Sequence, residues 1–172
     1  MKIKLLIIGN DGCGKSTLVK ILSPIMNIAE TSTVAAPYVF NELKYSRSYA
    51  TVEECHRDRV NERQVWKDFI RDVINGEDLS NLAKLAIKDG YDGLSGVRHR
   101  EEFEAIKKEG LFDYIIWVEG PNRKEPGKNS NELTKEDADL IVYNQTIVYD
   151  YLRNIFNLIR TILMKEKAIR AD

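Results

Sequence analysis

Apolar residues along this chain fall into short, nearly continuous runs, separated by stretches with helical spacing. The first run spans residues 3–8, and two more span residues 113–118 and 140–143. Runs of this length are typical of parallel strands that are buried on both faces of a sheet. Residues 91–97 form a weaker run that contains glycine, and they predict a fourth short strand.

Three short helices are predicted between these strands. Residues 15–22 are expected to form a helix that Ser23-Pro24 ends, residues 78–88 a second, and residues 100–108 a third that stops at Gly110. Strands that alternate with helices indicate an α/β fold around a parallel sheet, with helices on both faces.

Two longer stretches carry strong helical signals, and one stretch carries little. Thr51 precedes two acids and predicts a helix start, from which apolar residues at helical spacing continue to Asn75-Gly76. A last helix beginning near residue 148 has an apolar stripe, which would serve either the core alone or a dimer interface. The stripe consists of Val148, Leu152, Ile155, Phe156, Ile159, Ile162 and Leu163. Residues 27–50 are expected to form loops and short helices.

Size and composition are those of one globular domain spanning residues 1–172. A chain of 172 residues with 43% hydrophobic residues can bury a core, and its net charge of −1 excludes a polycation built for duplex DNA. Cys13 and Cys55 are the two cysteines and form no CxxC pair, which argues against a disulfide framework and a structural zinc site. The first apolar run is too short to span a membrane, so we expect a cytoplasmic protein that does not bind membranes.

Residues 9–16 match the phosphate-loop pattern G-x-x-x-x-G-K-[ST] between a buried strand and a helix. The glycines let backbone N–H groups face one anionic centre, to which the helix N-terminus adds its positive end. Lys15 supplies a charge for the β- and γ-phosphates, and Ser16 is placed to ligate Mg²⁺. The expected nucleotide-binding residues are Gly9, Asn10, Asp11, Gly12, Cys13, Gly14, Lys15, Ser16 and Thr17.

This motif narrows the fold prediction to the three-layer P-loop NTPase or kinase fold, with a central, mostly parallel sheet flanked by helices. No N-K-x-D motif specifies guanine, and the chain is short for a motor, so a small-molecule kinase is favoured. Asp11 places an acid in the loop, where either a metal ion or a substrate hydroxyl would offset it; a simple turn residue is the alternative. Cys13 is expected to pack against the strand ends rather than to react.

A kinase must also hold an acceptor and neutralise the transferring phosphoryl group. Arg98 and Arg100 follow the predicted 91–97 strand, at the sheet edge where ligands sit. Arg59 and Arg63 are expected one turn apart on one helix face, where they would grip a phosphate; surface ion pairs with neighbouring acids are the alternative. Lys15, Arg98 and Asp11 are thus the candidate catalytic residues.

Three further features are less specific. Residues 120–134 are a candidate lid loop with basic residues, the alternative being a solvated charged loop. Tyr38 and Trp66 offer rings that would stack on a base, although Trp66 also fits the core of its helix. No strand ends in the aspartate that usually supports Mg²⁺, because Asp92 lies near the start of its strand. The acids left for that task are Asp11, Glu53, Glu54, Asp58 and Glu119.

Several segments together resemble the bacteriophage-type deoxynucleoside monophosphate kinases of the P-loop, thymidylate-kinase-like superfamily. Residues 49–63 are similar to the family's Y-A-x-x-E-E-C…D-R-x-N-x-R segment, and residues 96–103 to its G-x-R-x-x-x-E-F segment. Residues 110–118 and 137–144 resemble its later strands, so that the similarity covers most of residues 1–163. The sequence departs from the family where Tyr143, rather than an aspartate, precedes Asn144, and where the phosphate loop follows the thymidylate-kinase form.

The resemblance implies transfer of a phosphoryl group from ATP, with Mg²⁺, to a deoxynucleoside monophosphate. It also favours Arg59, Arg63 and Arg98 as residues that line the site. With Tyr38, Glu54 and Arg100, which the residue patterns suggest, they are the candidate substrate-binding residues. Related phage enzymes phosphorylate 5-hydroxymethyluracil within DNA, and on that alternative a nucleic acid is the partner and a carboxylate base such as Glu54 or Asp11 gains importance. A regulator that binds ATP without kinase activity is a third hypothesis. Both a monomer and a homodimer are compatible with the sequence.

Overall fold

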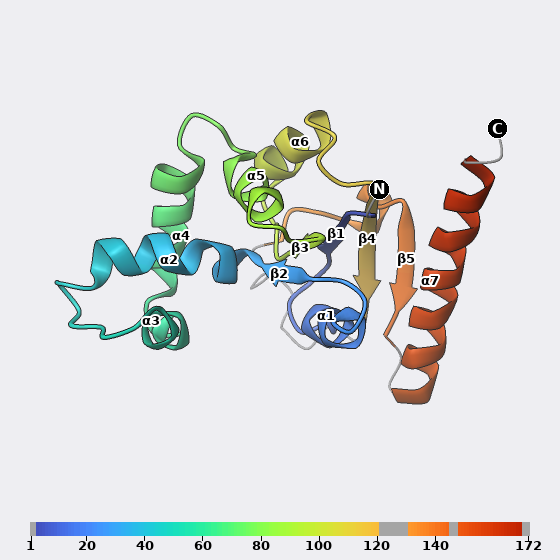
Figure 1. The fold of residues 1–172 in the computed structure, drawn as a ribbon, viewed down its shortest axis with the longest axis horizontal. Helices are drawn as coiled ribbons and strands as arrows, with labels where there is room; N and C mark the ends of the chain where they lie inside the picture. Colours follow the sequence, from blue (N-terminus) through green and yellow to red (C-terminus); the bar gives the residue numbers. More distant parts are fainter. Residues whose placement is uncertain (1–2, 121–130, 145–147, 170–172) are drawn as a thin grey trace.

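A computed structural model of the chain describes residues 3–120, 131–144 and 148–169. Its centre is a five-stranded, all-parallel sheet with the strand order β2-β3-β1-β4-β5 (Figure 1). The strands are β1 (Leu5–Ile8), β2 (Ile28–Glu30), β3 (Gly93–Ser95), β4 (Tyr114–Glu119) and β5 (Leu140–Tyr143). The predicted α/β fold with a parallel sheet between helices is confirmed.

Helices connect the strands and cover both faces of the sheet. They are α1 (Lys15–Leu22), α2 (Thr31–Leu43), α3 (Val52–Asp58), α4 (Arg63–Phe69), α5 (Asn81–Lys88), α6 (Arg100–Lys108) and α7 (Val148–Ile169), with a π-helical segment η1 (Ile70–Asn75) and a 3-10 turn η2 (Lys135–Asp137). The predicted bounds of α1 and α6 are confirmed to the residue. In α6, acids occupy the first turn and lysines the last, which complements the helix dipole.

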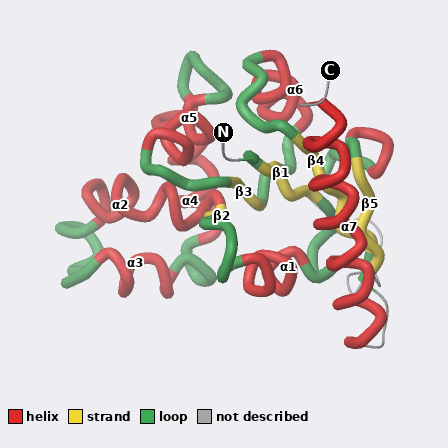
Figure 2. Tube along the Cα trace, turned by 45° about the vertical axis from the view of Figure 1, so that its right-hand side comes forward, coloured by secondary structure: helices red, strands yellow, loops and turns green. Residues whose placement is uncertain are grey.

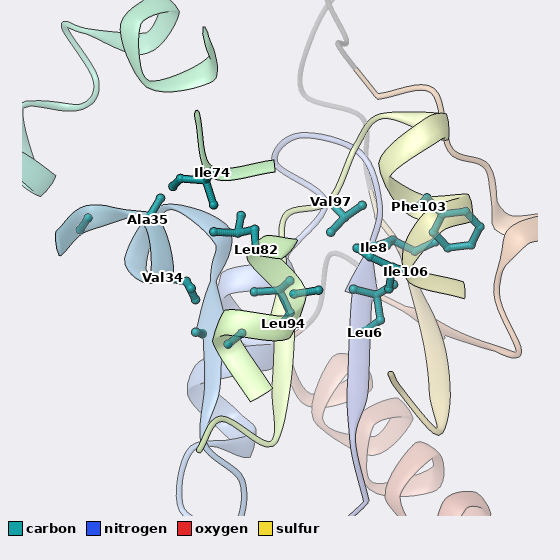
Figure 3. Close-up of a cluster of buried hydrophobic side chains, with 14 of the residues drawn as sticks. Leu6, Ile8, Val34, Ala35, Ile74, Leu82, Leu94, Val97, Phe103 and Ile106 are labelled. Carbon is teal, nitrogen blue, oxygen red and sulfur yellow. The ribbon is translucent and has the colours of Figure 1, made fainter. Parts of the chain in front are cut away.

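Alternate residues of β1 serve two separate apolar clusters. Leu6 and Ile8 face a cluster formed with α2, η1, α5 and α6, part of which Figure 3 shows. Leu5 and Ile7 face a second cluster formed with α1 and α7. Because β1 is buried on both faces, it needs apolar residues at every position, as its sequence has.

The central position of β1 determines where ligands can approach. β3 and β2 lie on one side of β1, and β4 and β5 on the other. The loop after β1 therefore opens at the middle of the carboxyl edge of the sheet, where parallel sheets bind ligands. Helices α2, α3 and α4 form an arm that extends beyond β2, as Figures 1 and 2 both show.

Two segments differ from their predicted structure. Residues 27–50 contain β2 and the 13-residue helix α2, rather than loops and short helices. The helical signal of α2 is weak in the sequence, because Pro37 stands inside it and proline is strongly disfavoured in a helix interior. Its stability comes from the burial of Val34 and Val39 in the larger cluster.

The single helix predicted over residues 51–75 is also wrong. α3 begins as expected, with Thr51 Oγ1 accepting a hydrogen bond from the Glu54 N–H (3.2 Å), but it ends at Asp58. The Asp58 carboxylate accepts a hydrogen bond from Asn61 Nδ2 (2.6 Å), and the Asp58 carbonyl accepts one from the Asn61 N–H. Such local bonds offer the backbone a turn in place of the helix, so that α4 starts afresh at Arg63.

The apolar stripe of α7 is only partly buried, so the core covers one part of it and leaves the other exposed. Ile155 and Ile162 lie in the core with Tyr151 and Leu158. The stripe residues that are instead exposed are Val148, Leu152, Phe156 and Leu163. Within the described residues, no helix combines the length and the apolarity that crossing a membrane requires.

Truncation of side chains on the two faces of α7 should have very different effects on stability. Ile155 is 1% exposed and Phe156 68% exposed. Ile155→Ala should lower the free energy of unfolding by about 2–5 kcal/mol, because it leaves a cavity in the core. Phe156→Ala should change it by less than about 0.5 kcal/mol. Urea unfolding of both variants measures this, and equal losses would contradict the described packing of α7.

Candidate functional site

The loop between β1 and α1 has positive φ at three glycines, of which Gly9 and Gly14 are also closely packed. Gly9 has φ 145° and Gly14 has φ 107°, both in the region that L side chains rarely adopt. A Cβ on Gly14 would collide with the Asn144 amide, and one on Gly9 would press on the Val118 carbonyl. Glycine is therefore needed at these positions both for the positive φ angles of the loop and for its close packing against neighbouring residues.

Lys15 folds back over this loop. Its Nζ donates to the Gly9 and Asn10 carbonyls, each at 2.7 Å, and lies 3.8 Å from Cys13 Sγ. Burial lowers the Lys15 pKa, and the Arg98 charge lowers it further, while Cys13 and Asp11 oppose the shift. An added phosphate would favour the charged lysine, since an anion beside an ammonium stabilises its protonated form.

An ion pair joins the phosphate loop to the end of β3. Arg98 follows β3 after the turn at Gly96, and its Nη2 lies 2.6 Å from Asp11 Oδ1. The Asp11 side chain is 15% exposed and that of Arg98 33%, so solvent partly screens the pair. The structure thus brings together Lys15, Asp11 and Arg98, the three candidate catalytic residues.

A second polar group lies where β2 ends. Ser16, at the start of α1, donates from Oγ to Glu30 Oε1 at 2.7 Å, and Arg59 Nη2 lies 3.6 Å from Glu30 Oε2. His56 Nε2 is 3.1 Å from Ser32 Oγ, and burial lowers the His56 pKa. The sequence reasoning missed Glu30. The available signal was the short apolar pair Ile28-Ala29 before it, which was too brief to predict a strand.

Side chains from distant segments fix the phosphate loop in place. Asn144 Nδ2 donates to the Cys13 carbonyl at 2.7 Å, and the Tyr151 hydroxyl donates to the Gly14 carbonyl at 3.0 Å. Asn131 Nδ2 donates to Asn10 Oδ1 at 3.1 Å. The loop is therefore held by residues beyond β4 as well as by its own backbone.

Cys13 is buried beneath the loop as expected, and burial raises the pKa of its thiol. Thr17 lies exposed on α1. Trp66 is 4% exposed and belongs to the core, as its helical position indicated. Asp92 precedes β3 and accepts from the Asn27 N–H at 2.9 Å, beside an apolar cavity of about 220 Å³ at the amino ends of the strands. That position is at the opposite edge of the sheet from the phosphate loop.

Other candidate substrate-binding residues have structural partners or lie apart. The Arg100 guanidinium binds the Asp137 carboxylate, with Nη2 2.8 Å from Oδ2, and so ties α6 to η2. Glu54 Oε2 accepts from the Ala50 N–H at 2.8 Å, and Tyr38 lies exposed on α2.

Arg59 and Arg63 do not share one helix face, which corrects the expected pair. Arg59 follows the last residue of α3, whereas Arg63 is the first residue of α4. The turn at Asn61 separates them, for the reason given above. Of the candidate lid, residues 121–130 lie outside the described residues, and with them Arg123, Lys124 and Lys128.

No protein-family model matches the sequence, and no curated protein matches it either. Over residues 3–120, 131–144 and 148–169, no three His, Cys, Asp or Glu side chains gather into a metal-binding group. The described site combines a loop with left-handed glycine backbone, the Lys15 and Arg98 cations, and the Ser16–Glu30 pair with Arg59 beside it.

The close packing at Gly14 can be tested against a matched glycine. Gly90 has φ 85° and nothing within 4 Å of its Cβ position, so Gly90→Ala introduces backbone strain alone. Such strain costs about 1–3 kcal/mol. Gly14→Ala should lower the free energy of unfolding further, because its Cβ also displaces the Asn144 amide. Urea unfolding compares the variants. Adding Asn144→Ala to Gly14→Ala should recover part of the lost free energy of unfolding, because it removes the amide that the new Cβ displaces. Equal losses for both glycines would refute the contact with Asn144.

Proposed function

We propose that this protein transfers the γ-phosphoryl group of ATP to a deoxynucleoside monophosphate and releases ADP and the diphosphate. The observation that carries the proposal is the phosphate loop: a buried strand leads into left-handed glycines, a lysine folded over the loop, and a helix that starts directly behind it. This arrangement supports binding of a nucleoside triphosphate. The resemblance to the monophosphate kinases supports ATP as donor and a monophosphate as acceptor.

On the donor side, the backbone N–H groups at the start of α1 and the Lys15 ammonium would contact the phosphates. Mg²⁺ fits this position by donor chemistry, because Ser16 Oγ and a carboxylate oxygen lie 2.7 Å apart. Magnesium in phosphoryl-transfer sites uses one or two protein oxygens together with phosphates and water, rather than a cage of side chains. When bound, it neutralises phosphate charge; Ser16 is the residue that we assign to it.

On the acceptor side, Arg98 and Arg59 follow elements that end at or beside the carboxyl edge of the sheet. Guanidinium groups suit a phosphate, which they can bind through two parallel hydrogen bonds. A monophosphate is largely ionised at neutral pH, so its oxygen needs cations nearby rather than a base to remove a proton. The two arginines therefore favour a phosphate acceptor.

In the proposed step, an oxygen of the acceptor phosphate forms a bond to the γ-phosphorus while the bond from that phosphorus to the ADP oxygen breaks. The electron pair of the breaking bond leaves with ADP. Lys15 and Arg98 would stabilise the negative charge on the transferring group. Asp11 would hold Arg98 in place until the phosphates arrive.

An acceptor screen with γ-labelled ATP and Mg²⁺ tests the proposal. The acceptors are the four deoxynucleoside monophosphates, the 5-hydroxymethyl pyrimidine monophosphates, and DNA that contains hydroxymethyluracil. We expect labelled diphosphate from a free monophosphate, and a loss of at least about 100-fold in Lys15→Ala. Lys20→Ala, exposed at the end of α1, is the matched control. Label only in DNA would make this a DNA-modifying enzyme, and ATP binding without transfer would make it a regulator; either result contradicts the proposal.

Removal of Arg98 should affect the acceptor more than ATP. Because Arg98→Ala alone would leave Asp11 without this partner, the double variant Asp11→Asn/Arg98→Ala is compared with Asp11→Asn. Loss of hydrogen bonds to a charged group predicts an acceptor KM about 10–100-fold higher, with the KM for ATP changed less than about threefold. Arg71→Ala, on η1, controls for removal of a surface charge. An equal rise in both KM values would move Arg98 to the nucleotide side.

A further inference from the structure

Of the two strands beside β1, β3 supplies no carboxylate where it ends, and β4 ends in Glu119, whose carboxylate accepts a hydrogen bond from Trp117 Nε1. β3 ends in Ser95 and continues into Gly96, and Ser95 is 2% exposed. Phosphate-loop enzymes commonly support their magnesium with an aspartate at the end of a strand near the loop. If a carboxylate supports magnesium in this protein, it comes from a residue other than the one at the end of β3.

Glu30 stands one strand further from β1, in register with Ser95. Its side chain is longer than that of aspartate, and it reaches Ser16, where Oε1 accepts the hydroxyl hydrogen bond at 2.7 Å. Glu30 also occupies the N-cap position of α2, yet its carboxylate makes no capping hydrogen bond to that helix. The carboxylate is directed instead at the hydroxyl that the phosphate-loop motif assigns to magnesium.

Four of the five acids considered for this task are engaged elsewhere, and the fifth, Glu53, is exposed in the first turn of α3. Asp11 pairs with Arg98, and Glu54 binds the Ala50 N–H. Asp58 accepts hydrogen bonds from the Tyr49 hydroxyl and Asn61, and Glu119 accepts one from Trp117 Nε1 at 2.7 Å. None of these contacts involves Ser16. Glu30 is therefore the carboxylate that the fold brings to the start of α1.

We propose that Glu30, together with Ser16, receives the magnesium ion of the bound nucleoside triphosphate, and that Arg59 orients the Glu30 carboxylate. A hydroxyl and a carboxylate are hard oxygen donors of the kind that Mg²⁺ prefers. Arg59 lies on the other carboxylate oxygen at 3.6 Å, which leaves Oε1 directed at Ser16. This inference rests on the proposed nucleotide binding, and it adds a metal-binding residue that lies outside the phosphate-loop motif.

The test measures metal affinity separately from turnover. Mn²⁺, followed by its electron paramagnetic resonance signal, is titrated into the full-length protein with a non-hydrolysable ATP analogue. Glu30→Gln should weaken Mn²⁺ binding at least about tenfold in this complex, as loss of a metal-supporting side chain commonly does. Binding of the analogue without metal should stay within about twofold of the original protein. Glu42→Gln removes the same charge from the exposed end of α2 and should match the original protein.

Each other outcome contradicts the proposal in a distinguishable way. If Glu30→Gln loses turnover but keeps its Mn²⁺ affinity, Glu30 acts on the acceptor instead. If neither changes, the Ser16 contact is only structural. If the original protein binds no nucleotide analogue at all, the proposed function fails, and this inference fails with it. If circular dichroism shows that Glu30→Gln is not folded at the temperature of the titration, Glu30→Asp replaces it. This variant keeps the charge but has a shorter side chain, and it should also weaken Mn²⁺ binding.

Discussion

The site depends on one packing constraint: β1 is buried on both faces, and the chain must leave it and begin α1 without side chains that would separate the surrounding elements. Gly9 lies against the Val118 carbonyl and Gly14 against Asn144, so β4 and the residue after β5 limit the space on both sides. Hydrogen bonds from Asn144 and Tyr151 to the loop carbonyls add to this hold. Contacts to the rest of the fold thus shape the loop without a ligand, which would lower the entropic cost of ordering it if a phosphate binds as proposed.

The electrostatics of this tightly packed loop account for the two carboxylates beside it. A loop that gathers backbone N–H groups and a half-buried lysine creates positive potential that a carboxylate can offset. Asp11 and Glu30 supply such carboxylates, the first to Arg98 and the second near Ser16 and Arg59. Phosphates that enter this site would compete with the two carboxylates for the same cations. Magnesium would resolve the competition at Glu30, because a divalent cation lets a carboxylate and a phosphate lie close together.

Local sequence patterns predicted the elements whose structure is decided locally. β5, α1 and α6 have their predicted bounds, since an apolar run, a proline stop or a glycine stop marks them. The region from residue 27 to residue 75 was predicted poorly. There α2 is stabilised by burial against α3 and α5 in spite of Pro37, and a bond between Asp58 and Asn61 interrupts the expected long helix. The exposed half of the α7 stripe shows the same limit, because periodicity identifies an apolar face but not what covers it.

The residues of the candidate site likewise fall into two groups, those that local sequence predicts and those that only the tertiary structure places. The phosphate-loop residues were predictable because consecutive residues form the loop, and Arg98 because it follows a strand at the carboxyl edge. Glu30 was not predictable, because its position depends on a three-residue strand and on the register of β2 with β3. This register has a functional consequence. Glu30 joins β2 to α2 and contacts both Ser16 and Arg59, so that under the proposed function one carboxylate would link the donor side of the site to the arm that carries Arg59. A change at Glu30 would therefore disturb both sides, and turnover alone would not separate them, whereas metal affinity reports only on the Ser16 side.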